Sequence, residues 1–392
     1  MFHFSKKVIY KILSSLDRGT LRIKEKSQEL IFGEHSDSDI HAEITVHDEK
    51  AFNMILKGGV VGAGEAYMKG YWSTPDLTSV IEYFLVNREI LDEIDGGVKF
   101  IQKALNKILH LRRRNTITGS KKNIIAHYDL SNDFYELWLD KKMMYSSAMF
   151  SNSMDTLDEA STHKLRTICE KLNLNEQDHL CEIGTGWGGM AIFAAKNYGC
   201  KVTTTTISDE QYDFAKSRIQ KEGLTDHITL LKKDYRLMTG DFSKLVSIEM
   251  IEAVGHEYLG SFFDKCNELL QPRGRGLIQA ITISDKYYER AKHSVDFIQK
   301  YIFPGGALAS IEVLEKLAQD QAQFELINSE SIGFDYAKTL NHWHQRFLSQ
   351  IDKIKSLGFS NEFINMWRFY LSYCEGGFKQ KTIDNYQILF SK

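Results

Sequence analysis

The sequence has little of several features that would point to a specialised class of protein. It holds only three prolines in 392 residues, five scattered cysteines without a CxxC pair, and a net charge of −3. An odd number of scattered cysteines argues against a disulfide framework or a zinc site, so we expect a reducing compartment and no bound metal. The near-neutral charge gives no general attraction to nucleic acid.

Long apolar runs are also missing. No stretch of about 18 apolar residues occurs, so we expect nothing in the sequence to span a bilayer. The opening residues, MFHFSKKVIYKILSSL, carry Lys11 within their apolar part and have no small-residue cleavage site. This pattern is a poor match to a signal peptide, and we therefore expect a cytoplasmic protein.

The length predicts two domains. Within residues 1–97, LRIKEK and HAEITVHD alternate apolar and polar residues, as half-buried strands do. GGVVGAGEAYMKGYW reads as a loop plus a short helix, and DLTSVIEYFL as a helix capped by Asp76. We expect a smaller α+β domain here.

Residues 98–122 differ from their surroundings, because Lys99 to Lys122 contain eight Lys and Arg and no acid. On a helix, the apolar residues of this stretch fall on one face, and Lys99, Lys103 and Lys107 fall elsewhere. A basic amphipathic helix of this kind can lie on an anionic membrane surface. A linker helix with a solvated basic face explains the pattern equally well.

From about Ser153 onward, strand-like runs alternate with helix-like runs, which predicts a doubly wound α/β domain within residues 123–392. The predicted strands are HLCEI, KVTTTTI, HITLL, LVSIEM, GLIQAIT, QFELIN and YQILFS.

Four glycines follow the first of these strands in HLCEIGTGWGG. Gly184 and Gly186 carry no Cβ, so the backbone can turn tightly and approach a ligand there, with the N-terminus of a helix beside it. The spacing is G-x-G-x-G rather than G-x-G-x-x-G, and the absence of GK[ST] excludes a P-loop. An adenosine-type cofactor site is favoured over a merely tight corner. The hydroxyls of VTTTTISDEQ and the acid Asp234 in KKDYR follow the next two strands and support it.

Taken together, several motifs resemble the cyclopropane-fatty-acid synthase family, which includes mycolic acid cyclopropane and methyl-transferring enzymes. They are HYDLSNDFYELWLD, MMYSSAMF, EIGTGWGG, TISDEQ, IEMIEAVGHEYL, KYIFPGG, DYAKTL and YCEGGF. The likeness runs from about residue 120 to the end, and GAGEAYMKGYW resembles the family's N-terminal lipid-binding region. It implies a seven-stranded, Rossmann-like class I methyltransferase domain that binds S-adenosylmethionine (SAM), and it suggests a homodimer.

By position, the resemblance also implies the cofactor contacts. Tyr145 and Ser146 would meet the amino acid end of SAM, Thr206 and Gln211 its ribose, and Tyr235 and Arg236 its adenine. The remaining implied cofactor residues surround the two glycines and the neighbouring strand ends: Glu182, Gly184, Thr185, Gly186, Trp187, Thr205 and Asp234.

The implied catalytic residues are Glu252, Tyr336, Gln279, Ser147, Ile281 and Cys374. In the family, the base is a bound bicarbonate held by a glutamate, a histidine, a tyrosine and backbone near a cysteine. Here Ser147 stands at the cysteine position and Gln279 at the histidine position, so bicarbonate would bind in a changed way or another base would act. Cys374 would lie near the pocket, although a packed thiol explains it as well.

The resemblance implies cyclopropanation of unsaturated acyl chains in membrane phospholipids. Ser147 and Gln279 leave open a methyl- or methylene-branched product instead. A catalytically silent lipid-binding protein is a third reading. An enzyme that acts on acyl chains must dock on a bilayer, which favours peripheral attachment of the basic stretch to the inner face of the cytoplasmic membrane.

Overall fold

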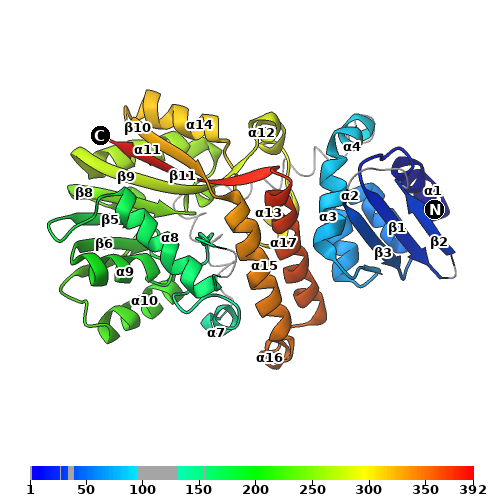
Figure 1. The fold of residues 1–392 in the computed structure, drawn as a ribbon, viewed down its shortest axis with the longest axis horizontal. Helices are drawn as coiled ribbons and strands as arrows, with labels where there is room; N and C mark the ends of the chain where they lie inside the picture. The colour runs from blue at the N-terminus through cyan, green and yellow to red at the C-terminus, as the bar shows by residue number, and fades with distance from the viewer. Residues whose placement is uncertain (1, 27, 34–38, 96–130, 153–154) are drawn as a thin grey trace. The chain divides into compact units, whose positions relative to one another are not determined.

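The chain folds into two units, each built from segments that are distant in the sequence (Figure 1). The computed structural model describes residues 2–26, 28–33, 39–95, 131–152 and 155–392. The basic stretch 98–122 and His127 lie outside these residues. None of the described helices is long and apolar enough to cross a membrane.

The first unit comprises Met1–Leu109, Ser294–Ile302 and Leu340–Thr382. Its sheet has the order β2-β1-β3-β4, in which β1 pairs antiparallel with β2 and parallel with β3. The strands are β1 (Thr20–Glu25), β2 (Gln28–Phe32), β3 (His41–Val46) and β4 (Trp72–Ser73). The two strands predicted from alternating residues are therefore confirmed as β1 and β3.

Most of this unit is helical, and Asp76 caps α3 as expected, its side chain accepting a hydrogen bond from the Ser79 backbone. The glycine-rich segment differs from the predicted loop plus short helix, because it forms much of the long helix α2, which is kinked at Gly59. A Cβ on Gly64 would lie 2.5 Å from the Phe297 ring, so this glycine permits close helix packing. The helices are α1 (Phe2–Leu13), α2 (Lys50–Met68), α3 (Leu77–Val86), α4 (Arg88–Asp95), α13 (Phe297–Tyr301), α16 (Ile351–Ser356) and α17 (Asn361–Lys379).

The units do not follow the expected continuous boundary at residue 123. Helix α17 packs against α2 and α3, which places residues 340–382 in the first unit. Helix α15 (Gly333–Ser349) crosses the division, which falls after Thr339. Burial of the apolar faces of α17 against the N-terminal helices explains this arrangement.

The second unit comprises His110–His293, Phe303–Thr339 and Ile383–Lys392. Its seven-stranded sheet has the order β10-β11-β9-β8-β5-β6-β7, with only β11 antiparallel to its neighbours. The strands are β5 (His179–Ile183), β6 (Lys201–Thr206), β7 (Ile228–Lys232), β8 (Phe242–Ile248), β9 (Leu270–Ile283), β10 (Glu325–Ser331) and β11 (Ile383–Ser391). The predicted seven-stranded, doubly wound domain is confirmed. The strand order reverses between β5 and β8, which is where such sheets bind ligands.

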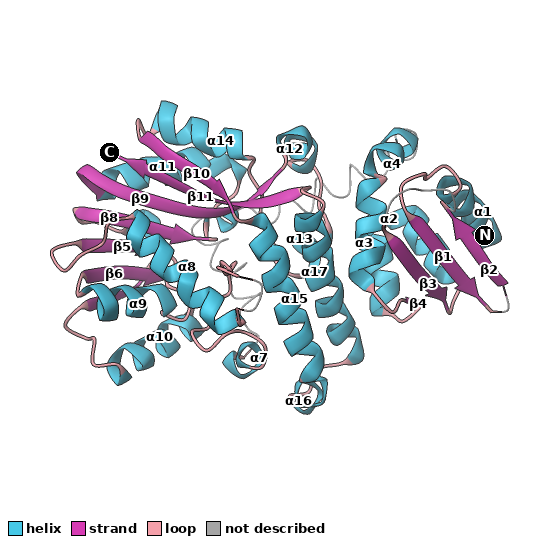
Figure 2. Ribbon diagram, in the orientation of Figure 1, coloured by secondary structure: helices cyan, strands magenta, loops and turns pink. Residues whose placement is uncertain are grey.

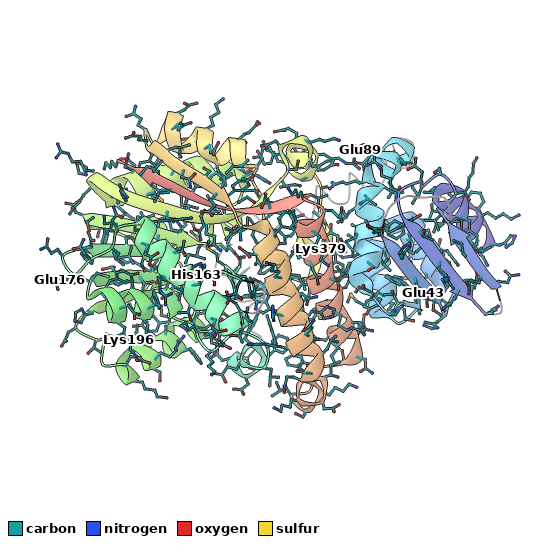
Figure 3. The ribbon with its side chains drawn as sticks, viewed as in Figure 1. Glu43, Glu89, His163, Glu176, Lys196 and Lys379 are labelled. Atoms are coloured by element: carbon teal, nitrogen blue, oxygen red, sulfur yellow. The ribbon has the colours of Figure 1, made fainter. Side chains whose placement is uncertain are left out.

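Helices cover both faces of this sheet (Figure 2). Along β5, Leu180 belongs to the apolar core under α8, α9 and α10, whereas Cys181 and Ile183 belong to the core under α11 and α14. Side chains alternate between the faces of a strand, so a nearly continuous apolar run serves both cores. The helices are α7 (Asn132–Glu136), α8 (Leu157–Lys171), α9 (Gly189–Tyr198), α10 (Asp209–Lys221), α11 (Leu259–Leu269), α12 (Asp285–Ala291) and α14 (Ile311–Lys316). Lys196 of α9, which is labelled in Figure 3, forms an ion pair with Glu222 at 2.6 Å.

Candidate active site

The turn between β5 and α9 exposes bare backbone at the switch point. Gly184, Gly186 and Gly188 have φ of +97°, +52° and +84°, a region that other residues rarely adopt. A Cβ on Gly184 would lie 3.0 Å from Met250 Cγ, whereas a Cβ on Gly186 would meet nothing within 4 Å among the described residues. The turn therefore forms an open cradle beside the N-terminus of α9, which fits an adenosine-type cofactor such as SAM.

Two predicted residues close to Gly184, Glu182 and Thr185, tie β5 to β6. Glu182 is 2% exposed and its carboxylate accepts a 2.6 Å hydrogen bond from the Thr204 hydroxyl. Burial raises the pKa of Glu182 to about 7. The Thr185 backbone N–H donates to the Thr205 carbonyl at 2.9 Å, which holds the turn against the next strand.

The end of β6 brings together the residues predicted to hold the ribose. The Thr206 hydroxyl lies 3.0 Å from Gln211 Oε1 and donates to it, and the Ser208 side chain caps α10 by accepting from the Gln211 backbone. The Thr205 hydroxyl donates to the Lys233 carbonyl. A polar corner thus follows the second strand, next to the glycine turn.

After β7, the predicted adenine-binding residues form one cluster. Both oxygens of Asp234 accept from Arg236, at 2.8 Å from Nε and 2.6 Å from Nη2. The guanidinium carbon lies 5.7 Å from the centre of the Tyr235 ring, and this ring packs edge-on against Phe262. The carboxylate of Asp234 therefore orients the guanidinium of Arg236.

Aromatic side chains surround Tyr145. Its ring lies 5.5 Å from Tyr135, 5.6 Å from Trp138 and 6.1 Å from Phe303, measured between ring centres. Trp187, from the glycine turn, lies 5.0 Å from Tyr135 and so extends this group toward α9. These rings form an apolar wall that can exclude water from neighbouring groups.

Ser146 meets a residue that the sequence analysis missed. Its hydroxyl oxygen accepts a 2.6 Å hydrogen bond from Lys164, a lysine of α8 that is 0% exposed. Burial lowers the pKa of Lys164 to about 8, while the carboxylates of Glu249 and Asp140 act in the opposite direction. Helical spacing was the sequence signal that could have identified Lys164, because this residue falls on the buried face of α8. Figure 3 labels its neighbour in the sequence, His163.

Three predicted catalytic residues converge on the carboxylate of Glu249, which the sequence analysis did not single out. Oε1 accepts from the Ser147 backbone N–H at 2.9 Å and from the Gln279 amide at 2.8 Å. It also accepts from the Asn385 amide at 2.6 Å. Oε2 accepts from the Tyr336 hydroxyl at 2.8 Å. Glu249 is half-buried, whereas Ser147 and Gln279 are 0% exposed.

The backbone at Glu249 is strained. Its φ is +48°, and the left-handed region costs a residue other than glycine roughly 1–2 kcal/mol. Its backbone N–H donates to the Gln279 carbonyl at 2.8 Å, which fixes the conformation directly after β8. Strain of this kind concentrates at functional sites. The sequence signal that could have identified Glu249 was the pair of glutamates in IEMIEAVG, directly after a predicted strand.

A hydrogen bond joins Glu252 and Ile281, which are both among the predicted catalytic residues. The Ile281 backbone N–H donates to Glu252 Oε1 at 2.5 Å, and Oε2 is buried without a hydrogen-bond partner in the part of the chain that the structure describes. Burial, followed by the charge of Glu249, raises the pKa of Glu252 to about 8. Near neutral pH its carboxyl is therefore mostly protonated and can donate a hydrogen bond.

Cys374 belongs to a different unit from the other predicted catalytic residues. It lies on α17 in the first unit, whereas the other five lie in the second. Burial raises the pKa of its thiol, which makes it a poor nucleophile.

The chain is similar to several known proteins. A family model described as mycolic acid cyclopropane synthetase matches residues 115–388. The chain is 34% identical over 351 residues to tuberculostearic acid methyltransferase UfaA1 of Mycobacterium tuberculosis, covering 85% of this chain and 79% of that protein. It is 33% identical over 355 residues to cyclopropane-fatty-acyl-phospholipid synthase of Escherichia coli, covering 90% and 88%.

A solved structure is similar as well. Mycolic acid cyclopropane synthase CmaA1, complexed with SAH and CTAB, aligns with a TM-score of 0.65 and 29% identity. The alignment covers 69% of this chain and 98% of that one. The residues matched by the family model include the glycine turn and every side chain around Glu249.

Proposed function

This chain belongs to the mycolic acid cyclopropane synthetase family and is a SAM-dependent methyltransferase, and we propose that it converts a double bond of an unsaturated acyl chain in a membrane phospholipid into a cyclopropane ring. The observation that carries this proposal is the carboxylate of Glu249, which follows β8 and accepts four hydrogen bonds. The next residue, Met250, packs against the glycine turn, so this carboxylate lies close to the cofactor cradle. Ring closure requires removal of a proton from the added methyl group, so the site must hold a base.

The chain's residues divide the work between binding and chemistry. The open turn at Gly186 would receive SAM, with Thr206 and Gln211 at its ribose and Tyr235 at its adenine. When bound, SAM supplies an electrophilic methyl group on a sulfonium. An isolated alkene is a weak nucleophile, so holding it in line with that methyl at close distance provides much of the rate.

The cation left on the acyl chain must be protected from water. The rings around Tyr145, including Trp138 and Phe303, supply negatively polarised faces that stabilise a cation without reacting with it. Exclusion of water also prevents capture of the cation as an alcohol.

The proposal is tested by incubating the full-length protein with SAM and vesicles of phospholipid that carries monounsaturated chains. Mass spectrometry should show a gain of one CH2 on the acyl chain, and proton NMR should show cyclopropane protons at unusually high field. Vesicles with saturated chains are the control. An unchanged acyl mass with unsaturated lipid would refute the proposal.

A second candidate product has support from the relatives. The likeness to tuberculostearic acid methyltransferase UfaA1, at 34% identity, favours a methyl- or methylene-branched chain. The same NMR experiment separates the two outcomes, because a methylene branch gives olefinic protons in place of the high-field signals.

The E. coli relative, named as a phospholipid-modifying synthase, supports a membrane lipid as substrate. We further propose that residues 1–97 bind lipid and that the eight basic residues between Lys99 and Lys122 attach the enzyme to the anionic inner face of the cytoplasmic membrane.

A further inference from the structure

The carboxylate of Glu249 fills a site that is lined by hydrogen-bond donors, as an anion-binding site would be. Among the described residues, four groups hydrogen-bond to its carboxylate, and all are donors: the Ser147 backbone N–H, the amides of Gln279 and Asn385, and the Tyr336 hydroxyl. The amide oxygen of Gln279 is turned away, since it accepts from Gln387 at 3.0 Å. This set would suit a small planar oxyanion, such as bicarbonate or formate.

The charges nearby leave little room for a second anion. Burial and the charge of Glu249 together favour the neutral form of Glu252, and the buried ammonium of Lys164 is attracted to Glu249. A free bicarbonate in the same place would face a carboxylate of equal sign in a desolvated setting, where like charges repel strongly.

We propose that Glu249 is the built-in base of this enzyme and occupies the position in which a bound bicarbonate would otherwise act. The inference rests on the proposed function, and it deepens that function by assigning the group that takes the proton. It also explains why Ser147 and Gln279 can stand at the positions of a cysteine and a histidine, because they need to hold a tethered carboxylate rather than a free ion.

The step balances without a further reactant. The π pair of the alkene forms the new bond to the methyl carbon while the carbon–sulfur bond breaks, and that bond's electron pair remains on the sulfur. The Glu249 carboxylate then takes one proton from the added methyl group, and the electron pair of that C–H bond closes the ring. One positive and one negative charge are thereby neutralised, and the carboxylic acid returns its proton to solvent before the next turnover.

The backbone at this position makes a direct test feasible. Glycine adopts a φ of +48° without the penalty that glutamate bears, so Glu249→Gly removes the carboxylate and relieves strain. It leaves four donors around an empty space, which an added anion can fill. Glu249→Gln keeps the shape of the side chain but cannot accept the proton, and Glu257→Gln, at an exposed glutamate nearby, is the matched control.

The first measurement is product formation from unsaturated phospholipid vesicles in bicarbonate-free buffer. We expect the wild type and Glu257→Gln to be fully active, and added bicarbonate to change neither. Glu249→Gly and Glu249→Gln should lose about 100-fold or more, the usual effect of removing a general base. Millimolar bicarbonate or formate should restore Glu249→Gly at least tenfold, and should leave Glu249→Gln inactive because its amide still fills the site.

The second measurement does not depend on turnover. Titration of 13C-labelled bicarbonate and formate, followed by NMR, should show binding to Glu249→Gly and none to the wild type. Stimulation of the wild type by bicarbonate, full activity of Glu249→Gly without it, or no anion binding by that variant would each overturn the inference. If the wild type forms no product from any vesicle, the base role fails together with the proposed function, while the titration still decides which group fills the anion position.

Discussion

The ammonium of Lys164 lies 2.6 Å from the hydroxyl oxygen of Ser146, and the lysine is 0% exposed. A cation in this position has lost its hydration, and Glu249 and Asp140 compensate for only part of that loss, so its pKa falls to about 8. The pair connects the loop that carries Ser147 to the buried face of α8.

Replacement of this lysine should change how stability depends on pH. The unfolded chain keeps the ordinary lysine pKa of 10.5. Between about pH 8 and 10.5 the unfolded state therefore binds more protons, and the Lys164 contribution to the free energy of unfolding rises with pH. In urea titrations across this range, wild type should gain stability relative to Lys164→Met. Parallel profiles for wild type and Lys164→Met would contradict the prediction.

Glu252 should produce a dependence of the opposite sign. Its folded pKa of about 8 lies above the ordinary 4.5, so the folded protein binds this proton more tightly than the unfolded chain does. The Glu252 contribution to stability is present in full below pH 4.5 and is lost as the pH rises through about 8. Relative to Glu252→Gln, the wild type should lose unfolding free energy from pH 5 to pH 8. Glu257→Gln is again the control, and a constant difference between wild type and Glu252→Gln would count against a raised pKa.

The glycine turn can be tested with a pair of matched substitutions. Gly186 and Gly223 have φ of +52° and +69°, and at both a Cβ would meet nothing within 4 Å. Alanine should therefore cost each site a similar amount of stability, about 1 kcal/mol. Only Gly186→Ala should weaken SAM binding in calorimetry, by tenfold or more, because its methyl group would enter the cofactor cradle. Equal SAM affinities of the two variants would show that the cradle lies elsewhere.

Membrane attachment depends on charge if the basic stretch provides it. Replacing Lys99, Lys103 and Lys107 by glutamate should strongly reduce co-sedimentation with anionic vesicles, because each basic residue contributes about 1 kcal/mol near such a surface. Salt should weaken binding of the wild type in the same assay. In the control variant, three exposed lysines, Lys316, Lys353 and Lys355, are replaced by glutamate, which changes the net charge by the same amount. Equal losses in both triple variants would assign the effect to net charge alone.

The sequence by itself determined the doubly wound domain and the local conformation of the glycine turn. Alternation of strand-like and helix-like runs predicts the parallel sheet, and the conformational freedom of Gly184 and Gly186 is a local property of the backbone. Thr206 and Gln211 could be placed for a similar reason, since they lie five residues apart around a single strand end.

Only the tertiary structure brought together the residues around Glu249. Ser147, Glu249, Gln279, Tyr336 and Asn385 come from five different segments, and their meeting depends on the register of β8, β9 and β11, which no local pattern encodes. Lys164 looked like an ordinary helix residue until the packing of α8 removed its water. The place of α17 was also decided by packing, because its apolar face finds its partners in α2 and α3, almost 300 residues earlier in the chain.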